Sequence, residues 1–168
     1  MKYCEETTRL HPLSIAYPTC VEKINNIIYE ETNPENRSKI NRPFNEEVGL
    51  KLDKVKENCK DKDITKKTKS VDMVLGLKDK ENTKMLLVDF KLNCRGINSL
   101  SQGDFTNKIK CSKNLLFGGG ITVHNVSLFI FNNEFLYKEE ARHNINKKLN
   151  NLPSIEVLSI NELKEKYF

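Results

Sequence analysis

The 168 residues of this chain fit one compact domain, and 38% hydrophobic with 30% charged residues is ordinary for a globular protein. No apolar run approaches the roughly 20 residues of a transmembrane helix, and the N-terminus MKYCEETTRLHP lacks the basic-then-apolar order of a signal peptide. The five cysteines form no CxxC pair, which argues against a disulfide framework and against structural zinc. We therefore expect a cytoplasmic protein that has no membrane segment.

The net charge of +5 is concentrated in residues 51–69, where eight lysines face four acids. A basic segment of this kind can meet a nucleic-acid backbone. The sequence is also rich in Asn, however, and an AT-rich genome produces both Lys and Asn without any binding role. The lysine segment alone therefore leaves both interpretations open.

Two helices are predicted in the first part of the chain. One begins after Pro18 and ends before Pro34, and the other begins at Pro43, which suits a first helical turn, and reaches about Cys59. Residues 60–70 are polar, have no core face and predict a loop. The apolar positions at helical spacing are Val21, Ile24, Ile27 and Ile28 in the first helix, and Phe44, Val48, Leu52 and Val55 in the second.

A β-hairpin is predicted next, because residues 71–77 and 84–92 are short apolar runs separated by a polar turn. A helix follows from about Ser101, which forms a capping-box pattern with Asp104, and it ends at the glycines of 118–120. This helix should bury Phe105, Ile109 and Leu116.

The remaining residues predict a strand at 126–131, a helix at 134–150, a strand at 155–160 and a short closing helix. We therefore expect one α/β domain over residues 1–168, with a central mixed β-sheet flanked by helices. Residues 1–40 would form an N-terminal helical extension, and residues 132–168 a C-terminal helix-strand-helix.

The tripeptide Asp89-Phe90-Lys91 is the first candidate for chemistry. The acid-x-Lys pattern occurs twice, but Glu162-Leu163-Lys164 lies in a polar terminal helix, whereas Asp89 and Lys91 interrupt the apolar strand MLLVDFKL. Side chains alternate along a strand, so Asp89 and Lys91 share one face. An acid and an amine thus project together from a strand that is buried on at least one side.

Asp72 lies inside the apolar run VDMVL of the preceding strand, which the hairpin would bring beside Asp89. Two neighbouring carboxylates repel each other, so a cation between them would be favourable. Oxygen ligands of this kind suit Mg²⁺ or Mn²⁺ better than zinc.

Together, Val71-Asp72 and Asp89-Phe90-Lys91 resemble the motif of the PD-(D/E)xK nuclease superfamily over about residues 43–131. The resemblance implies a restriction-endonuclease-like core (αβββαβ) and a metal-dependent endonuclease that hydrolyses phosphodiester bonds, with DNA as the substrate. Val71 stands where the name-giving proline would be, and only two strands of the three-stranded meander are evident. The third strand could lie in 60–70 or in 92–98.

The resemblance also assigns roles to individual residues. Asp72, Asp89 and the Phe90 carbonyl would bind Mg²⁺ or Mn²⁺, and a Glu on the first core helix would hold a metal water or a second ion. Glu47 is preferred over Glu46, because Glu47 lies at the edge of the apolar helix face. Lys91 would orient and help to deprotonate the attacking water. Lys108, Lys110 and Lys113 on the following helix are candidates for contact with the nucleic-acid backbone.

Two alternatives remain at this point. Asp89 and Lys91 could be a same-face ion pair on a half-exposed strand, with Asp72 as a strand-start carboxylate. The chain could also be a catalytically inactive nuclease-like scaffold that acts as a protein-binding factor, in immunity or in assembly. Many members of the superfamily cut two strands as homodimers, so a homodimer is a further expectation, although the sequence shows no interface.

Overall fold

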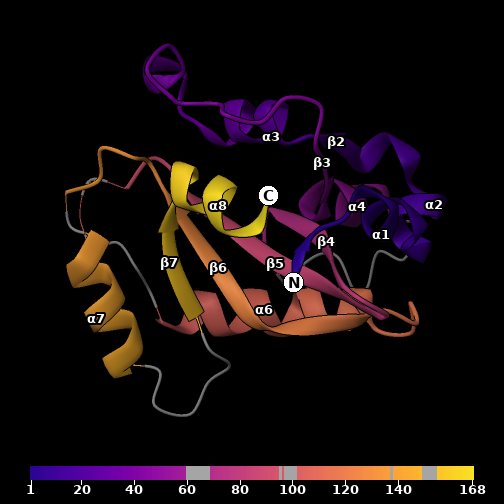
Figure 1. Cartoon of the computed structure of the whole chain (residues 1–168). Helices are drawn as coiled ribbons and strands as arrows, with labels where there is room; N and C mark the ends of the chain where they lie inside the picture. Colours follow the sequence, from indigo (N-terminus) through magenta and orange to yellow (C-terminus); the bar gives the residue numbers. More distant parts are fainter. Residues whose placement is uncertain (60–68, 95, 97–101, 137, 149–154) are drawn as a thin grey trace.

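The computed structural model describes residues 1–59, 69–94, 96, 102–136, 138–148 and 155–168. Within these residues a seven-stranded mixed sheet lies between layers of helices, which confirms an α/β fold (Figure 1). No helix in the described parts of the chain is both long and apolar enough to cross a membrane.

The sheet has the strand order β2-β3-β4-β5-β6-β7. The strands from β2 to β5 are antiparallel to their neighbours, whereas β5, β6 and β7 run parallel. The short β1 pairs with the end of β4 that β3 leaves free. The strands are β1 (Lys2–Tyr3), β2 (Val21–Lys23), β3 (Val48–Lys51), β4 (Met73–Asp79), β5 (Asn82–Lys91), β6 (Thr122–Phe131) and β7 (Ile155–Ser159).

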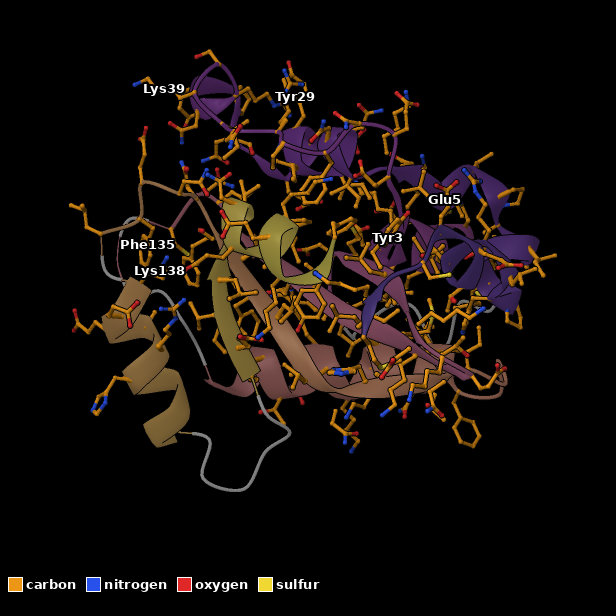
Figure 2. All side chains as sticks on the ribbon, in the orientation of Figure 1. Tyr3, Glu5, Tyr29, Lys39, Phe135 and Lys138 are labelled. Carbon is orange, nitrogen blue, oxygen red and sulfur yellow. The ribbon has the colours of Figure 1, made fainter. Side chains whose placement is uncertain are left out.

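Two hydrophobic cores lie on opposite faces of the sheet, and side chains fill the space on both sides (Figure 2). Helices α4, α6 and α7 contribute to one core, and α3 and α8 contribute to the other. The helices are α1 (Glu5–Leu10), α2 (Pro12–Ala16), α3 (Ile24–Glu31), α4 (Leu52–Asn58), α6 (Gln102–Leu116), α7 (Lys138–Lys148) and α8 (Ile160–Tyr167), with 3₁₀ turns η1 (Pro18–Cys20) and η2 (Pro34–Asn36).

The β4–β5 hairpin is confirmed, with Met73 opposite Val88 and Asp79 opposite Asn82. Alternation sends Met85 and Leu87 of β5 into the core beneath α6, while Leu86, Val88 and Phe90 enter the opposite core. Helix α6 then crosses over to β6, and its predicted core residues Phe105, Ile109 and Leu116 are all buried. Asp89 and Lys91 consequently lie on the α6 side of the sheet.

The predicted helix from Pro43 to Cys59 is wrong in its first half. Residues 48–51 form β3, and only Leu52–Asn58 are helical, as α4. All four residues of β3 are buried, so the strand has no polar face to reveal a period of two. A Cβ at Gly49 would lie 2.5 Å from Met73 Sδ, which shows how closely β3 approaches β4. β3 pairs antiparallel with β4, which pairs antiparallel with β5. The described residues of 92–98 form no strand, and residues 60–68 lie outside the described part of the chain.

The N-terminal residues are more than a helical extension, because β1 and β2 join the sheet. The predicted helix after Pro18 begins only at Ile24, since Val21 belongs to β2. Helices α1 and α2 lie in residues 1–17, within the predicted helical extension. The closing helix, the strand at 126–131 and the strand at 155–160 are confirmed with small shifts of their ends. The predicted start at Ser101 lies outside the described residues.

Gly76 on β4 receives the N-terminal segment. The Gly76 N–H donates to Thr8 Oγ1 at 2.8 Å, and the Gly76 carbonyl accepts from Cys4 N–H at 2.9 Å. Tyr3 adds a second anchor, because its hydroxyl lies 2.9 Å from Val48 N and its ring stacks on Phe168 (Figure 2). A Cβ at Gly76 would lie 2.4 Å from Thr8 N, so no side chain fits there.

We expect Gly76→Ala to lower the free energy of unfolding by about 1–3 kcal/mol, because the added methyl group forces backbone apart. Gly96→Ala is the matched control, since a Cβ there meets no atom of the described residues within 4 Å. Urea denaturation of both variants measures the difference. Equal stability of the two variants would show that the N-terminal segment does not dock on β4.

Candidate functional site

Asp72 and Asp89 lie side by side on the α6 face of the sheet. Asp72 immediately precedes β4, and the hairpin register that pairs Met73 with Val88 brings the next residues, Asp72 and Asp89, opposite each other. Both side chains are buried, and Asp89 is only 1% exposed. Two carboxylates are thus held together in the core by the register of one hairpin.

The main chain fixes the orientation of Asp72. Its Oδ2 accepts a hydrogen bond of 2.6 Å from the Phe90 N–H, and its carbonyl accepts one of 3.1 Å from the Leu52 N–H. At the point where the β4–β5 ladder ends, the Asp72 carboxylate therefore accepts the Phe90 hydrogen bond in place of a backbone carbonyl. Rotation of this carboxylate would leave a buried N–H without a partner.

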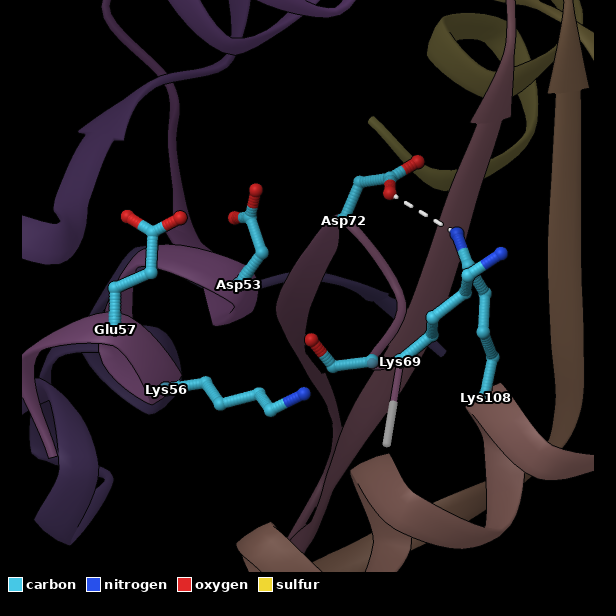
Figure 3. A pocket seen from close by; sticks show the side chains of 7 residues that line it. Asp53, Lys56, Glu57, Lys69, Asp72 and Lys108 are labelled. Atoms are coloured by element: carbon cyan, nitrogen blue, oxygen red, sulfur yellow. Dashed lines mark hydrogen bonds and ion pairs between the residues drawn. The ribbon is translucent and has the colours of Figure 1, made fainter. Parts of the chain in front are cut away.

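Lys108 of α6 bridges the two carboxylates. Its Nζ lies 2.5 Å from Asp89 Oδ1 and 3.3 Å from Asp72 Oδ1 (the Asp72 contact is dashed in Figure 3). Burial alone would lower the pKa of Lys108, but Asp89 and Asp72 outweigh burial and hold that pKa above its ordinary value. Lys108 is therefore a permanently charged ammonium between two acids.

Lys91 forms the second ion pair of the site, with Asp89 Oδ2. Its Nζ also lies 5.2 Å from the centre of the Phe105 ring and 5.8 Å from that of Phe129, within the range of cation–π contact. No hydrogen bond from the described residues is directed at the buried Asp89 Oδ2. This oxygen is thus held by charge, without a donor aligned to it.

Two acids and two ammonium groups make the formal charge of this cluster zero. The balance is imperfect for Asp72, whose pKa is raised to about 7 by burial first and then by the charge of Asp89, against the opposing effect of Lys108. Asp72 is accordingly the acid that changes its charge near neutral pH.

Ser112 fixes α6 over the site. Its hydroxyl donates to the Lys108 carbonyl at 2.8 Å and accepts from the Val71 N–H at 2.9 Å. Lys108 and Ser112 are one turn apart on α6, so a single helix face carries both the bridging ammonium and the contact to the residue before Asp72. These two hydrogen bonds fix α6 over the site, and with it the position of Lys108 relative to the carboxylates.

A cavity of about 470 Å³ opens beside Asp72 and Lys108 (Figure 3). Asp53 and Glu57 of α4 stand on its opposite side, so the cavity has acidic groups on two walls. Its lining residues are Asp53, Lys56, Glu57, Lys69, Ser70, Asp72 and Lys108.

Glu31, at the end of α3, is a further acid near the cluster. Its pKa is raised by burial first and then by Asp53, while Lys51 and Lys108 act in the opposite direction. Lys51 Nζ lies 3.7 Å from Glu31 Oε1 and 2.5 Å from Glu30 Oε2. The sequence contained a signal for Glu31, because it continues the helical spacing of the buried Ile24, Ile27 and Ile28.

Glu47 does not lie on a helix, because the residues that were predicted to be helical around it form a loop and then β3. Its carboxylate pairs with Lys164 of α8, and although burial raises its pKa, the hydrogen bond from Lys164 brings that pKa below its ordinary value. Glu46 pairs with Lys23 at 2.7 Å. Glu31, unlike Glu47, lies on a helix, and its charge interacts with Lys108 and Asp89 of the cluster.

The lysines of α6 divide into two kinds. Lys108 turns inward to the carboxylates, whereas Lys110 is exposed and Lys113 is half-exposed. Among the described residues, no three His, Cys, Asp or Glu side chains are grouped closely enough to hold a metal ion. The structure brings Asp72 and Asp89 together as predicted, with Lys91 beside Asp89, and no third acid of the described residues is grouped with them.

Comparison with family models, with curated proteins and with solved structures finds no match for this chain.

We expect stability to depend on pH through Asp72. Because its folded pKa is raised from 3.8 to about 7, the contribution of Asp72 to stability is fully present below pH 3.8 and is lost as the pH rises through 7. The free energy of unfolding of the wild type, relative to Asp72→Asn, should fall by about 1–3 kcal/mol from pH 5 to pH 8. Denaturant titrations at both pH values measure this, with the exposed Asp79→Asn as control. A difference that is constant with pH would contradict the assignment.

Ser112→Ala should lower the free energy of unfolding by about 1–3 kcal/mol, since it leaves the buried Val71 N–H without its acceptor. Ser127→Ala is the matched control: Ser127 is equally buried, but its hydroxyl has no hydrogen bond to any described residue. We expect the control to change stability by less than about 0.5 kcal/mol. Urea denaturation compares the two, and equal losses would argue against a role for Ser112 in fixing α6.

Proposed function

We propose that this chain is a metal-dependent endonuclease of the PD-(D/E)xK type, which hydrolyses phosphodiester bonds of DNA. The observation that carries the proposal is the convergence of Asp72, Asp89 and Lys91 on one buried face, at the end of two adjacent strands. Burial of charged groups is unfavourable unless they are paired or serve another purpose. An acid pair with a neighbouring amine is the arrangement that the nuclease chemistry requires.

The order of the elements supports a restriction-endonuclease-like core. Helix α3 precedes the antiparallel strands β3, β4 and β5, with α4 added between β3 and β4, after which α6 crosses over to β6, parallel to β5. This is the helix, meander, helix and strand order that the resemblance implies. Asp72 then lies just before the second strand of the proposed meander and Asp89 on the third, close to where the motif expects them.

The donor atoms fit Mg²⁺ or Mn²⁺. Such ions keep several waters and need only one or two carboxylates from the protein, which Asp72 and Asp89 would supply. Phe90 already contacts Asp72 through its N–H, so its carbonyl is a third donor in the same segment. Asp72 Oδ1 and Asp89 Oδ1 both contact Lys108 Nζ, so these two oxygens point to a common place. We propose Glu31, in place of Glu47, to hold a water or a second ion.

A divalent ion bound here would stabilise negative charge that develops on the phosphate. Lys91 would hold and orient the attacking water, because its ammonium pairs with Asp89 Oδ2 and its position is fixed against Phe105 and Phe129. Its long side chain is thereby restricted before substrate arrives, which lowers the entropic cost of positioning.

The exposed Lys110 and the half-exposed Lys113 would contact the phosphate backbone from α6. These contacts position a nucleic acid without reading its sequence. Cleavage of both strands of a duplex would take two copies of this chain, so we include a homodimer in the proposal.

The second candidate is an inactive nuclease-like scaffold that binds a protein partner. The observation in its favour is the zero formal charge of the cluster, in which Lys91 and Lys108 already neutralise Asp72 and Asp89. A buried ion-pair network whose charges are all paired can specify a fold without taking part in a reaction. The two candidates differ in whether the site takes up a divalent ion.

We expect purified protein to cut plasmid DNA with Mg²⁺ or Mn²⁺ and not with EDTA. Asp89→Ala and Lys91→Ala should each lower the rate by at least about 100-fold, since each removes a group in direct contact with the reacting atoms. Glu31→Gln should lower it less, by about ten-fold, as a group that acts through water. Gel assays on supercoiled and single-stranded DNA measure these rates.

Lys78→Ala is the control for this series, because Lys78 is exposed on β4 and should leave the rate unchanged. Cutting that persists in Asp89→Ala would mean a contaminating nuclease. A folded wild type that neither binds Mn²⁺ nor cuts DNA would favour the scaffold.

A further inference from the structure

Lys108 occupies the space in which a cation would bind both carboxylates. Its ammonium contacts Asp89 Oδ1 at 2.5 Å and Asp72 Oδ1 at 3.3 Å, whereas Lys91 contacts only Asp89. The two lysines therefore differ in position: Lys91 contacts one carboxylate, and Lys108 lies between both carboxylates. A divalent ion shared by Asp72 and Asp89 would need the same oxygens that Lys108 now holds.

We propose that Lys108 is an internal cation that competes with the divalent ion for Asp72 and Asp89, and that it must withdraw before the ion binds. The inference rests on the proposed metal-dependent function and adds a regulatory step to it. With Lys91 and Lys108 in place the cluster is already neutral, so a divalent ion would bring two excess positive charges beside an ammonium. Departure of Lys108 removes that repulsion.

The surroundings of Lys108 allow the side chain to leave while the helix stays. Ser112 holds the Lys108 carbonyl and the Val71 N–H, so the α6 main chain is fixed. The side chain borders the 470 Å³ cavity, on whose far side Asp53 and Glu57 offer two further carboxylates (Figure 3). Rotation about its side-chain bonds would move the Lys108 ammonium from Asp72 and Asp89 towards Asp53 and Glu57.

The competition has a measurable size. If the carboxylates are free of Lys108 in about one tenth of the molecules, the apparent Kd for the ion is weakened about ten-fold. Removing the ammonium then tightens binding by the same factor. A lysine with a purely structural role gives the opposite result, because its loss would loosen the site and weaken the binding of the ion.

The experiment is Mn²⁺ binding by calorimetry to the wild type, Lys108→Met, Lys108→Arg and Lys110→Met, each first checked for folding by circular dichroism. We expect Lys108→Met to bind about ten-fold more tightly than the wild type. Lys108→Arg keeps the positive charge and should bind as weakly as the wild type or more weakly. Lys110→Met is the matched control, since it removes one charge from the exposed side of the same helix.

Equal or weaker binding by folded Lys108→Met, with clear binding by the wild type, overturns the competition and leaves the nuclease proposal intact. Absence of binding in every variant, Lys108→Met included, overturns the metal site itself and the competition with it. Binding by Lys108→Met alone supports the competition. The double variant Asp89→Asn, Lys108→Met should lose the gain if the ion binds at this site.

A measurement on the unaltered chain covers the case in which Lys108→Met does not fold. The ¹⁵N-detected ammonium signal of Lys108, assigned by its loss in Lys108→Arg, should be protected from fast proton exchange in EDTA. Addition of Mg²⁺ should abolish this protection as the group moves towards solvent. Retained protection at saturating Mg²⁺ would show that the ion and the ammonium do not exclude each other.

Discussion

Asp72 and Asp89 bring two like charges within reach of one ammonium, on a face of the sheet from which most water is excluded. In such surroundings the attraction to a nearby cation and the repulsion between the acids are both larger than in water. Lys108 has a raised pKa and Asp72 a pKa of about 7, and both shifts follow from this one arrangement. This arrangement of two acids around one ammonium is held by the position of α6, by the hydrogen bonds of Ser112 and by the ion pair of Lys91 with Asp89.

Two local rules of sheet geometry, side-chain alternation and antiparallel pairing, bring the two acids together. Alternation along β5 directs residues 85, 87, 89 and 91 to the α6 side, so the strand changes from apolar to charged without changing face. Antiparallel pairing with β4 then brings Asp72 to the same end. The parallel crossover to β6 requires a helix over that face, and the helix brings Lys108 with it.

The sequence could reveal the hairpin and its acids, because both depend on contacts that are close along the chain. It could not reveal β3, whose four residues are buried on both faces and adjoin α4, so that Val48, Leu52 and Val55 matched a helical period by coincidence. Glu47 was misplaced for that reason. Lys108 was separable from Lys110 only by helical phase, since it falls three residues after the buried Phe105 and four before the buried Ser112.

The location of Lys108 on the crossover helix also bears on the order of folding. The β4–β5 hairpin joins residues that are close in sequence, and hairpins form within about 1–10 μs. This hairpin, however, brings Asp72 and Asp89 together before α6 has docked between β5 and β6. Before α6 covers the hairpin, Asp72 is not yet buried and lacks the main cause of its raised pKa, so both acids are ionised at neutral pH and oppose the hairpin until the ammonium arrives. Docking of α6 should therefore stabilise the end of the hairpin that carries the two acids.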